Sequence, residues 1–354
     1  YIEKMRERIE EGVQKVRVTV REKGPSREDI DHAVKQFQRG IANVLDELPD
    51  VLARLGSFEF RTKPGHTFEE EFAGRLTVEQ PVEIVVHNAA GGIEVKAGDD
   101  SLSYRVKVIN RVHVEDENEA RRLSEASIVW HATDAGFELK AGTRTKVTAK
   151  IVITLPRHLL YQADLVSETG SLVWRGVNAS SLTISSEDGS IVLEDVKTER
   201  VQVQGANGSV RLKHVHAAST HVSTGNGSIR FTGSSPDLHL RTENGSVRCV
   251  FAVNDEEPER HHGHHQWDIG TANGSVTVKV PGGGAFGYRC DLRAEHGRVL
   301  AELPSFVEEG GADPSHIAGA SRDFDTKPIQ MTLKVRTGSG LIRIETADRE
   351  ETAE

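Results

Sequence analysis

The segment Val201-Gln-Val-Gln-Gly-Ala-Asn-Gly-Ser-Val-Arg-Leu212 is one copy of a unit that recurs between residues 167 and 251. Successive copies are 19, 19, 19 and 18 residues apart. A fixed period of this length is the signature of a repeat architecture. Each copy contains a Gly-Ser pair, and the glycines of these pairs are Gly170, Gly189, Gly208, Gly227 and Gly245.

Apolar and polar residues alternate on both sides of each repeat glycine. In the unit above, Val203 and Leu212 occupy apolar positions, whereas Gln202 and Arg211 occupy polar ones. Period-two alternation is typical of strands with one buried face. Asn-Gly or Asp-Gly separates the two strands in most copies, and these residues tolerate a left-handed backbone. Each unit is therefore predicted to be strand, tight turn and strand, with positive φ at the glycine.

The same frame fits the sequence around Gly91, Gly274, Gly297 and Gly340, so about nine units are predicted. Stacked units would form a mainly β protein, a β-solenoid of ~19-residue coils with one continuous core. An Asn-Gly turn between alternating strands is also typical of a hairpin, so an antiparallel β-sandwich or barrel of repeated hairpins is the alternative. The near-constant unit length favours the solenoid.

Three regions are expected along the chain. Residues 1–55 carry apolar residues at helical spacing and are predicted to be an α-helical element that caps the solenoid, self-associates or docks a protein partner. Residues 57–346 form the β-repeat region, less regular over 57–160 and regular over 161–346. Insertions are expected at residues 252–265 and 304–328. Residues 347–354 are expected to form a disordered tail.

The amino-acid composition limits which partners the protein can bind and in which cell compartment it can lie. The formal net charge is −10, which gives no support to a nucleic-acid-binding surface. No apolar run is long enough for a transmembrane segment. Cys249 and Cys290 both fall on inward positions and are expected to be buried thiols, not a disulfide framework. Residue 1 is Tyr, so we expect a trimmed N-terminus and leave open a cytoplasmic or cell-envelope location in a bacterium.

The chain resembles the bacterial putative-adhesin family of β-strand-repeat proteins, a domain of largely unknown function. The resemblance rests on Asn88-Ala-Ala-Gly-Gly-Ile-Glu-Val95, on Val152-Ile-Thr-Leu-Pro156 and on the strand–Asn/Ser-Gly–strand units from Thr169 onward. It covers about residues 57–346. It implies adhesion or a link to cell-envelope stress, and it brings no catalytic residues.

A histidine-rich segment is the most concentrated set of metal ligands in the sequence. Four imidazoles within five residues could bind Zn²⁺, Ni²⁺ or Cu²⁺. The spacing of a structural zinc site is not present, and the segment falls in a predicted insertion, so incidental binding of Zn or Ni is the alternative. No cofactor is expected otherwise. The histidines are His261, His262, His264 and His265.

Three arginines occupy the same outward position, three residues after the glycine, in successive units. Stacking of the units would place Arg211, Arg230 and Arg248 in a ladder on one face. Such a ladder is either a solvated face that discourages aggregation or a surface for an anionic polymer or lipid head group.

The sequence contains no Ser–His–Asp pattern, nucleophile elbow or phosphate loop, so no enzymatic activity is expected. Carboxylates beside the turns, Glu168, Glu187, Asp188 and Glu243, are interpreted as turn residues. The predicted function is a non-enzymatic scaffold or binding protein, adhesin-like or involved in sensing at the cell envelope. The alternatives are a self-polymerising filament protein and, behind it, a glycan-active β-helix enzyme.

Overall fold

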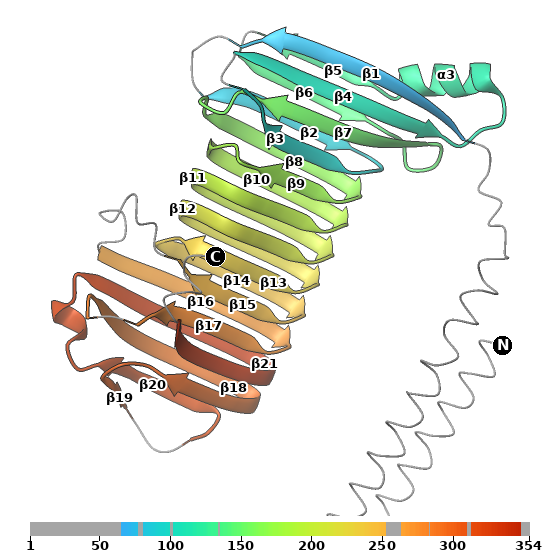
Figure 1. The fold of residues 1–354 in the computed structure, drawn as a ribbon. Helices are drawn as coiled ribbons and strands as arrows, with labels where there is room; N and C mark the ends of the chain where they lie inside the picture. Colours follow the sequence, from blue (N-terminus) through green and yellow to red (C-terminus); the bar gives the residue numbers. More distant parts are fainter. Residues whose placement is uncertain are drawn as a thin grey trace, which may run out of the picture. The chain divides into compact units, whose positions relative to one another are not determined.

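A computed structural model describes residues 65–76, 81–99, 102–133, 135–252, 263–282, 284–309 and 313–347. Backbone contacts divide the chain into two units, residues 1–62 and 63–354. The first unit lies outside the described residues, and so does the predicted helical region 1–55. Within the described ranges, no helix is long and apolar enough to cross a membrane. The described part of the second unit is mainly β (Figure 1).

The regular part of this unit is a stack of parallel coils. Val203 pairs with Ile184 on one side and with Val222 on the other, and Leu212 pairs in the same way with Leu193 and Phe231. Parallel pairing between equivalent residues of successive units indicates a β-solenoid-like fold and makes the hairpin alternative wrong. The strands of this part are β8 (Tyr161–Thr169), β9 (Leu172–Arg175), β10 (Ala179–Asp188), β11 (Ile191–Asn207), β12 (Val210–Asn226), β13 (Ile229–Ser234), β14 (Asp237–Asn244), β15 (Val247–Phe251), β16 (Gly263–Asn273) and β17 (Val276–Pro281).

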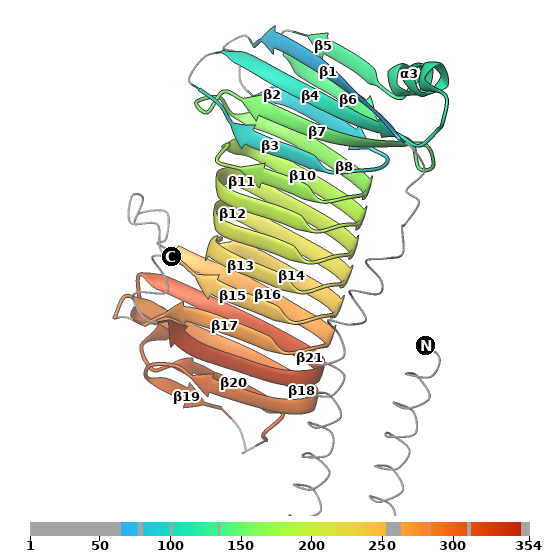
Figure 2. The same ribbon diagram turned by 45° about the vertical axis from the view of Figure 1, so that its right-hand side comes forward.

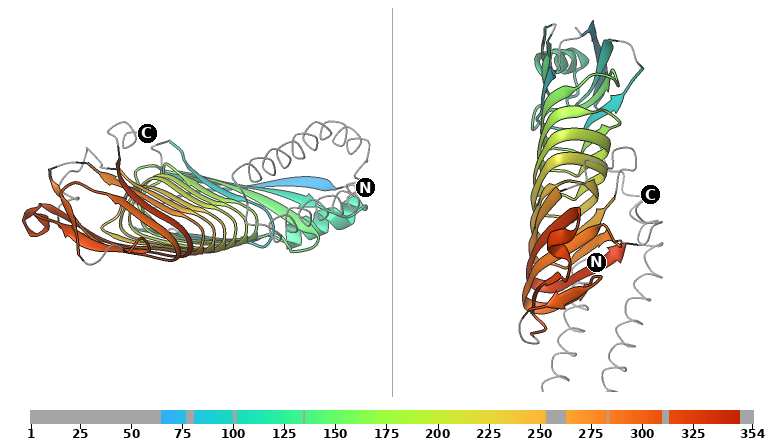
Figure 3. Two further views of the ribbon diagram at one scale, coloured as in Figure 1. Left: turned by 90° about the horizontal axis from the view of Figure 1, so that it is seen from below. Right: turned by 90° about the vertical axis from the view of Figure 1, so that its left-hand side faces the viewer.

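Each coil contributes one strand segment before its turn glycine and one after it. We call the stacked segments before the glycines the first layer, and those after them the second layer. Strands β11 and β12 are long because each continues from the second layer of one coil into the first layer of the next. Figure 3 (left) looks along the stack, so the coils are seen one behind another. The inward side chains of both layers join one core, in which Val203 and Leu212 are each 1% exposed.

The first end of the stack does not follow sequence order. The coil made by β2 (Val82–Asn88) and β3 (Ile93–Ala97) lies between the β8–β9 coil and a coil made by β6 (Gly136–Ala141) and β7 (Val147–Leu155). Antiparallel strands then close this end. β4 (Ser103–Val112) pairs with β7, β1 (His66–Arg75) pairs with β4, and β5 (Val129–Thr133) pairs with β6.

A single helix, α3 (Glu117–Ala126), connects β4 to β5 in this end (Figure 2). It begins at Asp116, whose carboxylate accepts a 2.7 Å hydrogen bond from the backbone N–H of Glu119. This N-cap satisfies one of the backbone donors that a helix leaves free in its first turn.

At the other end of the stack, the spatial order of the strands again differs from their order in the sequence. β21 (Ile329–Ala347) lies between the β16–β17 coil and β18 (Phe286–Glu302), although β18 comes earlier in sequence. β20 (His316–Ser321) pairs antiparallel with β18, and β19 (Phe306–Glu308) pairs with β20. The predicted insertion 304–328 therefore contains these two strands and η2 (Phe324–Thr326), which form an end cap and the path by which the chain returns.

The repeat glycines are required for a second reason besides the predicted one. The predicted positive φ is confirmed at five repeat glycines, with values from 111° to 153°, at Gly91, Gly170, Gly208, Gly274 and Gly340. It is wrong at Gly189, Gly227, Gly245 and Gly297, whose φ lies outside the left-handed range. In addition, a Cβ on Gly227 would lie 2.0 Å from the carbonyl oxygen of Gly208. The same overlap occurs in the other coils of the ladder, because each glycine lies directly against the glycine of the neighbouring coil.

We expect Gly227→Ala to lower the free energy of unfolding by about 1–3 kcal/mol, because the new methyl group overlaps a backbone carbonyl that cannot rotate away. Gly284→Ala is the control, since nothing lies within 4 Å of its Cβ position. Urea unfolding of the two variants checks this. Equal stability of both would contradict the close-approach explanation.

The strand register predicts opposite outcomes for two neighbouring substitutions. Val203→Asp places a charge in the apolar core and should lower the melting temperature strongly. Gln202→Asp changes an exposed side chain and should leave the melting temperature almost unchanged. Thermal melts followed by circular dichroism measure both, and similar shifts would overturn the register.

Both cysteines are free and buried, as predicted. Burial raises the pKa of the Cys249 thiol well above its usual value and the pKa of Cys290 to about 12. Since the thiolate is the reactive form, neither thiol should react with a disulfide reagent in the native protein at pH 8. Both should react in guanidinium chloride. Rapid labelling of one thiol in the native protein would contradict its placement.

Candidate functional site

The predicted arginine ladder occupies neighbouring rungs of the second layer. Arg211 on β12 pairs in register with Arg230 on β13, which pairs with Arg248 on β15. All three side chains are exposed because they alternate with buried residues such as Leu212 and Phe231. Parallel rungs are about 4.7–4.9 Å apart. The structure thus brings together three guanidinium groups that are 18 or 19 residues apart in sequence.

The ladder itself is basic, although the carboxylate of Glu194 lies on the neighbouring strand opposite Lys213. Neither Arg211 nor Arg230 forms an ion pair with a residue in the described ranges. Lys213, two residues after Arg211 on the same strand, is also exposed. Like charges on adjacent rungs destabilise a sheet, so the neighbouring Arg211 and Arg230 cost stability unless an anion or solvent screens them. Exposed serines adjoin the arginines on the turn side of this row, at Ser209 and Ser246.

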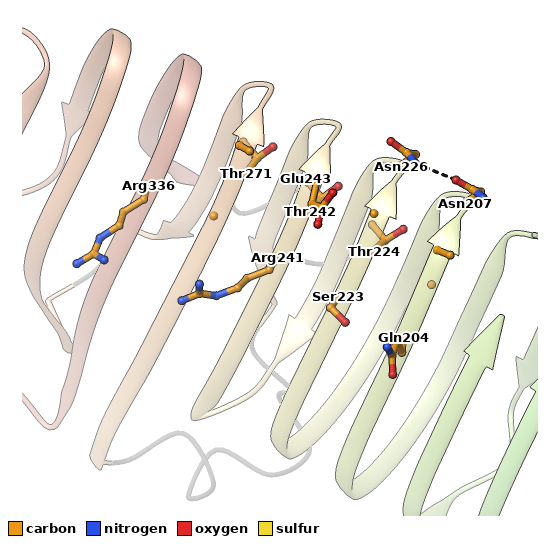
Figure 4. Close-up of a pocket in the computed structure, with 15 residues that line it drawn as sticks. Gln204, Asn207, Ser223, Thr224, Asn226, Arg241, Thr242, Glu243, Thr271 and Arg336 are labelled. Atoms are coloured by element: carbon orange, nitrogen blue, oxygen red, sulfur yellow. Dashed lines mark hydrogen bonds between the residues drawn. The ribbon is translucent and has the colours of Figure 1, made fainter. Parts of the chain in front are cut away.

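A groove crosses the first layer near the turns (Figure 4). Its volume is about 710 Å³. Small residues hollow the surface, since Gly205, Gly225 and Gly270 lie where neighbouring coils carry larger side chains. Arg241 and Arg336 border the groove, and Arg241 donates a 2.9 Å hydrogen bond to Asp268.

Asparagines along the turns form a second ladder beside this groove. Asn226 donates to Asn207 at 2.9 Å, Asn244 donates to Asn226 at 2.9 Å, and Asn207 donates to Asp188 at 2.8 Å. The side-chain amide is both donor and acceptor, so one asparagine per coil extends the chain of hydrogen bonds. The Asp188 carboxylate is therefore part of the turn structure.

Two other turn carboxylates also have structural partners. Glu168 and Glu187 both form ion pairs with Arg144, in the turn between β6 and β7. Hydrogen bonding to Glu168 raises the pKa of the Arg144 guanidinium further above its usual value. Glu243 is exposed at the groove. These positions agree with the interpretation of turn residues.

The histidine-rich segment is divided between two environments. His261 and His262 lie outside the described residues. Strand β16 begins at Gly263, so His264 and His265 are consecutive strand residues and point to opposite faces. His264 is exposed, whereas His265 is 1% exposed and packs edge-on against Phe251 with ring centroids 5.6 Å apart. The prediction that all four imidazoles converge on one ion was therefore wrong, because the side chain of His265 belongs to the core. Metal binding by the remaining three stays a prediction.

The structure also assembles a polar cluster that the sequence analysis missed. Ser219 and His221 on β12 face Asp237 and His239 on β14 in register. The two histidines occupy the same position, six residues before the glycine, in successive coils. The repeat frame could have indicated this pair, but Asp237 joins it only through the pairing of β12 with β14.

Comparison with known proteins gives one family and several distant structures. The Toastrack DUF4097 family model matches residues 82–345. No curated protein matches the chain. A crystal structure of a putative adhesin from Bacteroides fragilis has 11% identity and a TM-score of 0.39, and the match covers 80% of this chain and 97% of the other. A putative adhesin from Parabacteroides merdae has 10% identity and a TM-score of 0.36, with 80% and 96% covered.

A third structure, described as a putative lipid binding protein from Parabacteroides distasonis, has 13% identity, a TM-score of 0.33 and coverage of 80% and 97%. The family match covers most of the described β region and includes the Asn88–Val95 segment and the repeated units that carried the resemblance. The predicted family is therefore confirmed, and the chain belongs to the Toastrack DUF4097 family of β-repeat proteins.

Proposed function

We propose that the protein is a non-enzymatic binding scaffold that holds an extended anionic polymer of the bacterial cell envelope along the arginine ladder. The observation that carries this proposal is the alignment of Arg211, Arg230 and Arg248 on adjacent exposed rungs. Guanidinium groups bind carboxylates and phosphates through paired hydrogen bonds, which a lysine cannot reproduce.

The geometry favours a repeating ligand over a single small anion. A row of charges spaced at about 4.7–4.9 Å presents several weak sites in line, and a polymer that occupies them together gains affinity through multivalency. The flanking serine hydroxyls supply further donors to acidic groups or sugar hydroxyls. The net charge of −10 keeps general attraction to polyanions low, so binding would depend on this local surface.

Two alternatives receive less support. A glycan-active enzyme needs paired carboxylates at an open site. In the described residues, three of the four turn carboxylates considered above are held by Arg144 or by the asparagine ladder. A filament formed by end-to-end stacking needs the open strand edges of the end coils. Antiparallel strands occupy these edges at the first end, where β4 pairs with β7 and β5 with β6, and β20 occupies part of the edge of β18 at the other end.

Binding of polygalacturonate, an acidic polysaccharide, tests the proposal. We expect the triple variant Arg211→Gln/Arg230→Gln/Arg248→Gln to lose at least about tenfold in affinity, because several charge-assisted contacts disappear together. Binding to the native protein should also weaken as salt rises. Isothermal titration calorimetry in low salt measures both effects.

The matched control is Arg105→Gln/Arg241→Gln/Arg336→Gln, which removes the same charge from the other layer and from β4. It should bind polygalacturonate like the native protein. Neutral dextran should bind none of the proteins. Equal losses in the two triple variants would mean non-specific charge attraction and would refute the ladder as the site. Equal binding of a single-stranded nucleic acid would contradict the assignment of the ligand to an envelope polymer.

A further inference from the structure

A cluster of two imidazoles and one carboxylate lies on the outer face of the first layer. The potential ligand atoms of His221, Asp237 and His239 all lie within 4.8 Å of one another. The three side chains are exposed or half-buried, so an ion can reach them from solvent. We propose that these residues form a binding site for a divalent transition-metal ion, with Zn²⁺ the best match to its ligands.

One edge of the site is already close to metal-bound geometry. His239 Nε2 is 3.0 Å from Asp237 Oδ1. Two ligands bonded to tetrahedral zinc at about 2.0–2.2 Å are separated by about 3.3–3.6 Å, so this pair needs little adjustment. The ion would replace the hydrogen that the two atoms share. Nitrogen and oxygen donors in this combination suit Zn²⁺, and also Ni²⁺ or Cu²⁺.

The second imidazole is held beside the first by strand register. His221 and His239 are paired residues of parallel strands, and their rings stack with centroids 4.4 Å apart and an interplanar angle of 15°. Because His221 is exposed, rotation of its side chain can bring a ring nitrogen to the ion without moving the backbone.

A fourth side chain orients the carboxylate. Ser219 donates its hydroxyl hydrogen to Asp237 Oδ2 at 2.8 Å, which leaves Oδ1 directed toward His239. Ser219 Oγ is also 3.2 Å from His221 Nδ1. Hydrogen bonds of this kind fix ligand orientation at metal sites and contribute to affinity.

Three protein ligands leave one tetrahedral position for water or for an atom of a bound molecule. The groove near the turns begins next to this site. Ser223 and Arg241, which line the groove, are the next outward-facing residues after His221 and His239 on the same two strands. Asp268 lies opposite His239 on β16, but Arg241 engages its carboxylate. The site is independent of the arginine ladder, which lies on the second layer.

Direct measurement of Zn²⁺ binding tests this site, with the histidine-rich segment removed as a competing chelator. The parent is the full chain carrying His261→Ala, His262→Ala and His264→Ala; His265 is retained because it is buried. Competition with a chromophoric zinc chelator gives stoichiometry and affinity. We expect one Zn²⁺ per chain in the parent, and an affinity loss of at least about tenfold after His221→Ala/His239→Ala.

The control is His214→Ala in the same parent. His214 Nδ1 is 2.9 Å from Asp195 Oδ1, a similar histidine–carboxylate pair, but it lies outside the three-donor cluster. Its substitution should leave Zn²⁺ affinity unchanged. Co²⁺ in place of Zn²⁺ should give visible absorption bands of a tetrahedral ion in the parent and in His214→Ala, but not in the double variant.

The proposal is overturned if the parent does not bind Zn²⁺, or if the double variant binds it as tightly as the parent does. Thermal melting confirms that each variant is folded. If His221→Ala lowers the melting temperature, His221→Gln/His239→Gln, which preserves much of the side-chain volume, takes its place.

Discussion

The stack depends on the contact between one turn glycine and the next. A parallel sheet holds neighbouring strands about 4.7–4.9 Å apart, and the turns must approach each other equally closely. At these turns the space where a Cβ would lie is occupied by the glycine carbonyl of the neighbouring coil, at 2.0 Å for both Gly189 and Gly227. A side chain there would push the turns apart and weaken the pairing of both layers.

Two further ladders depend on that contact. The hydroxyl of Thr242 donates to the carbonyl of Gly227 at 2.9 Å, and Thr271 donates to Gly245 at 2.8 Å. Outside them, the asparagine amides link coil to coil. A buried carbonyl without a donor is costly, so the inward hydroxyls supply donors that the close approach of the turns makes necessary. Glycine, threonine and asparagine thus act together at the turns of Gly227, Gly245 and Gly274, whereas Gly205 replaces the threonine in the coil of Gly208.

This construction determines where chemistry can be placed. In a solenoid, side chains at equivalent positions of successive coils become neighbours, so binding groups come in rows. The guanidinium row on the second layer and the imidazole pair on the first layer arise in this way. The groove arises where such rows are interrupted, because Gly270 lies between Arg241 and Arg336 on the neighbouring strands. The end caps stop the rows, and they also cover part of the edges of the stack.

The sequence by itself determined the strand–turn–strand unit, its inward and outward faces, the buried thiols and the alignment of Arg211 with Arg230, because all of these follow from a local period. The tertiary structure decided what depends on contacts between distant segments. No pattern in β18 or β21 specifies that β21 enters the stack before β18, since both carry the same frame and could pair with β17. Likewise, Asp237 meets His221 only because β12 pairs with β14, and His265 enters the core only because β16 begins at Gly263. Periodicity records which face a residue occupies, whereas the order of coils and the partners across them are set by long-range packing.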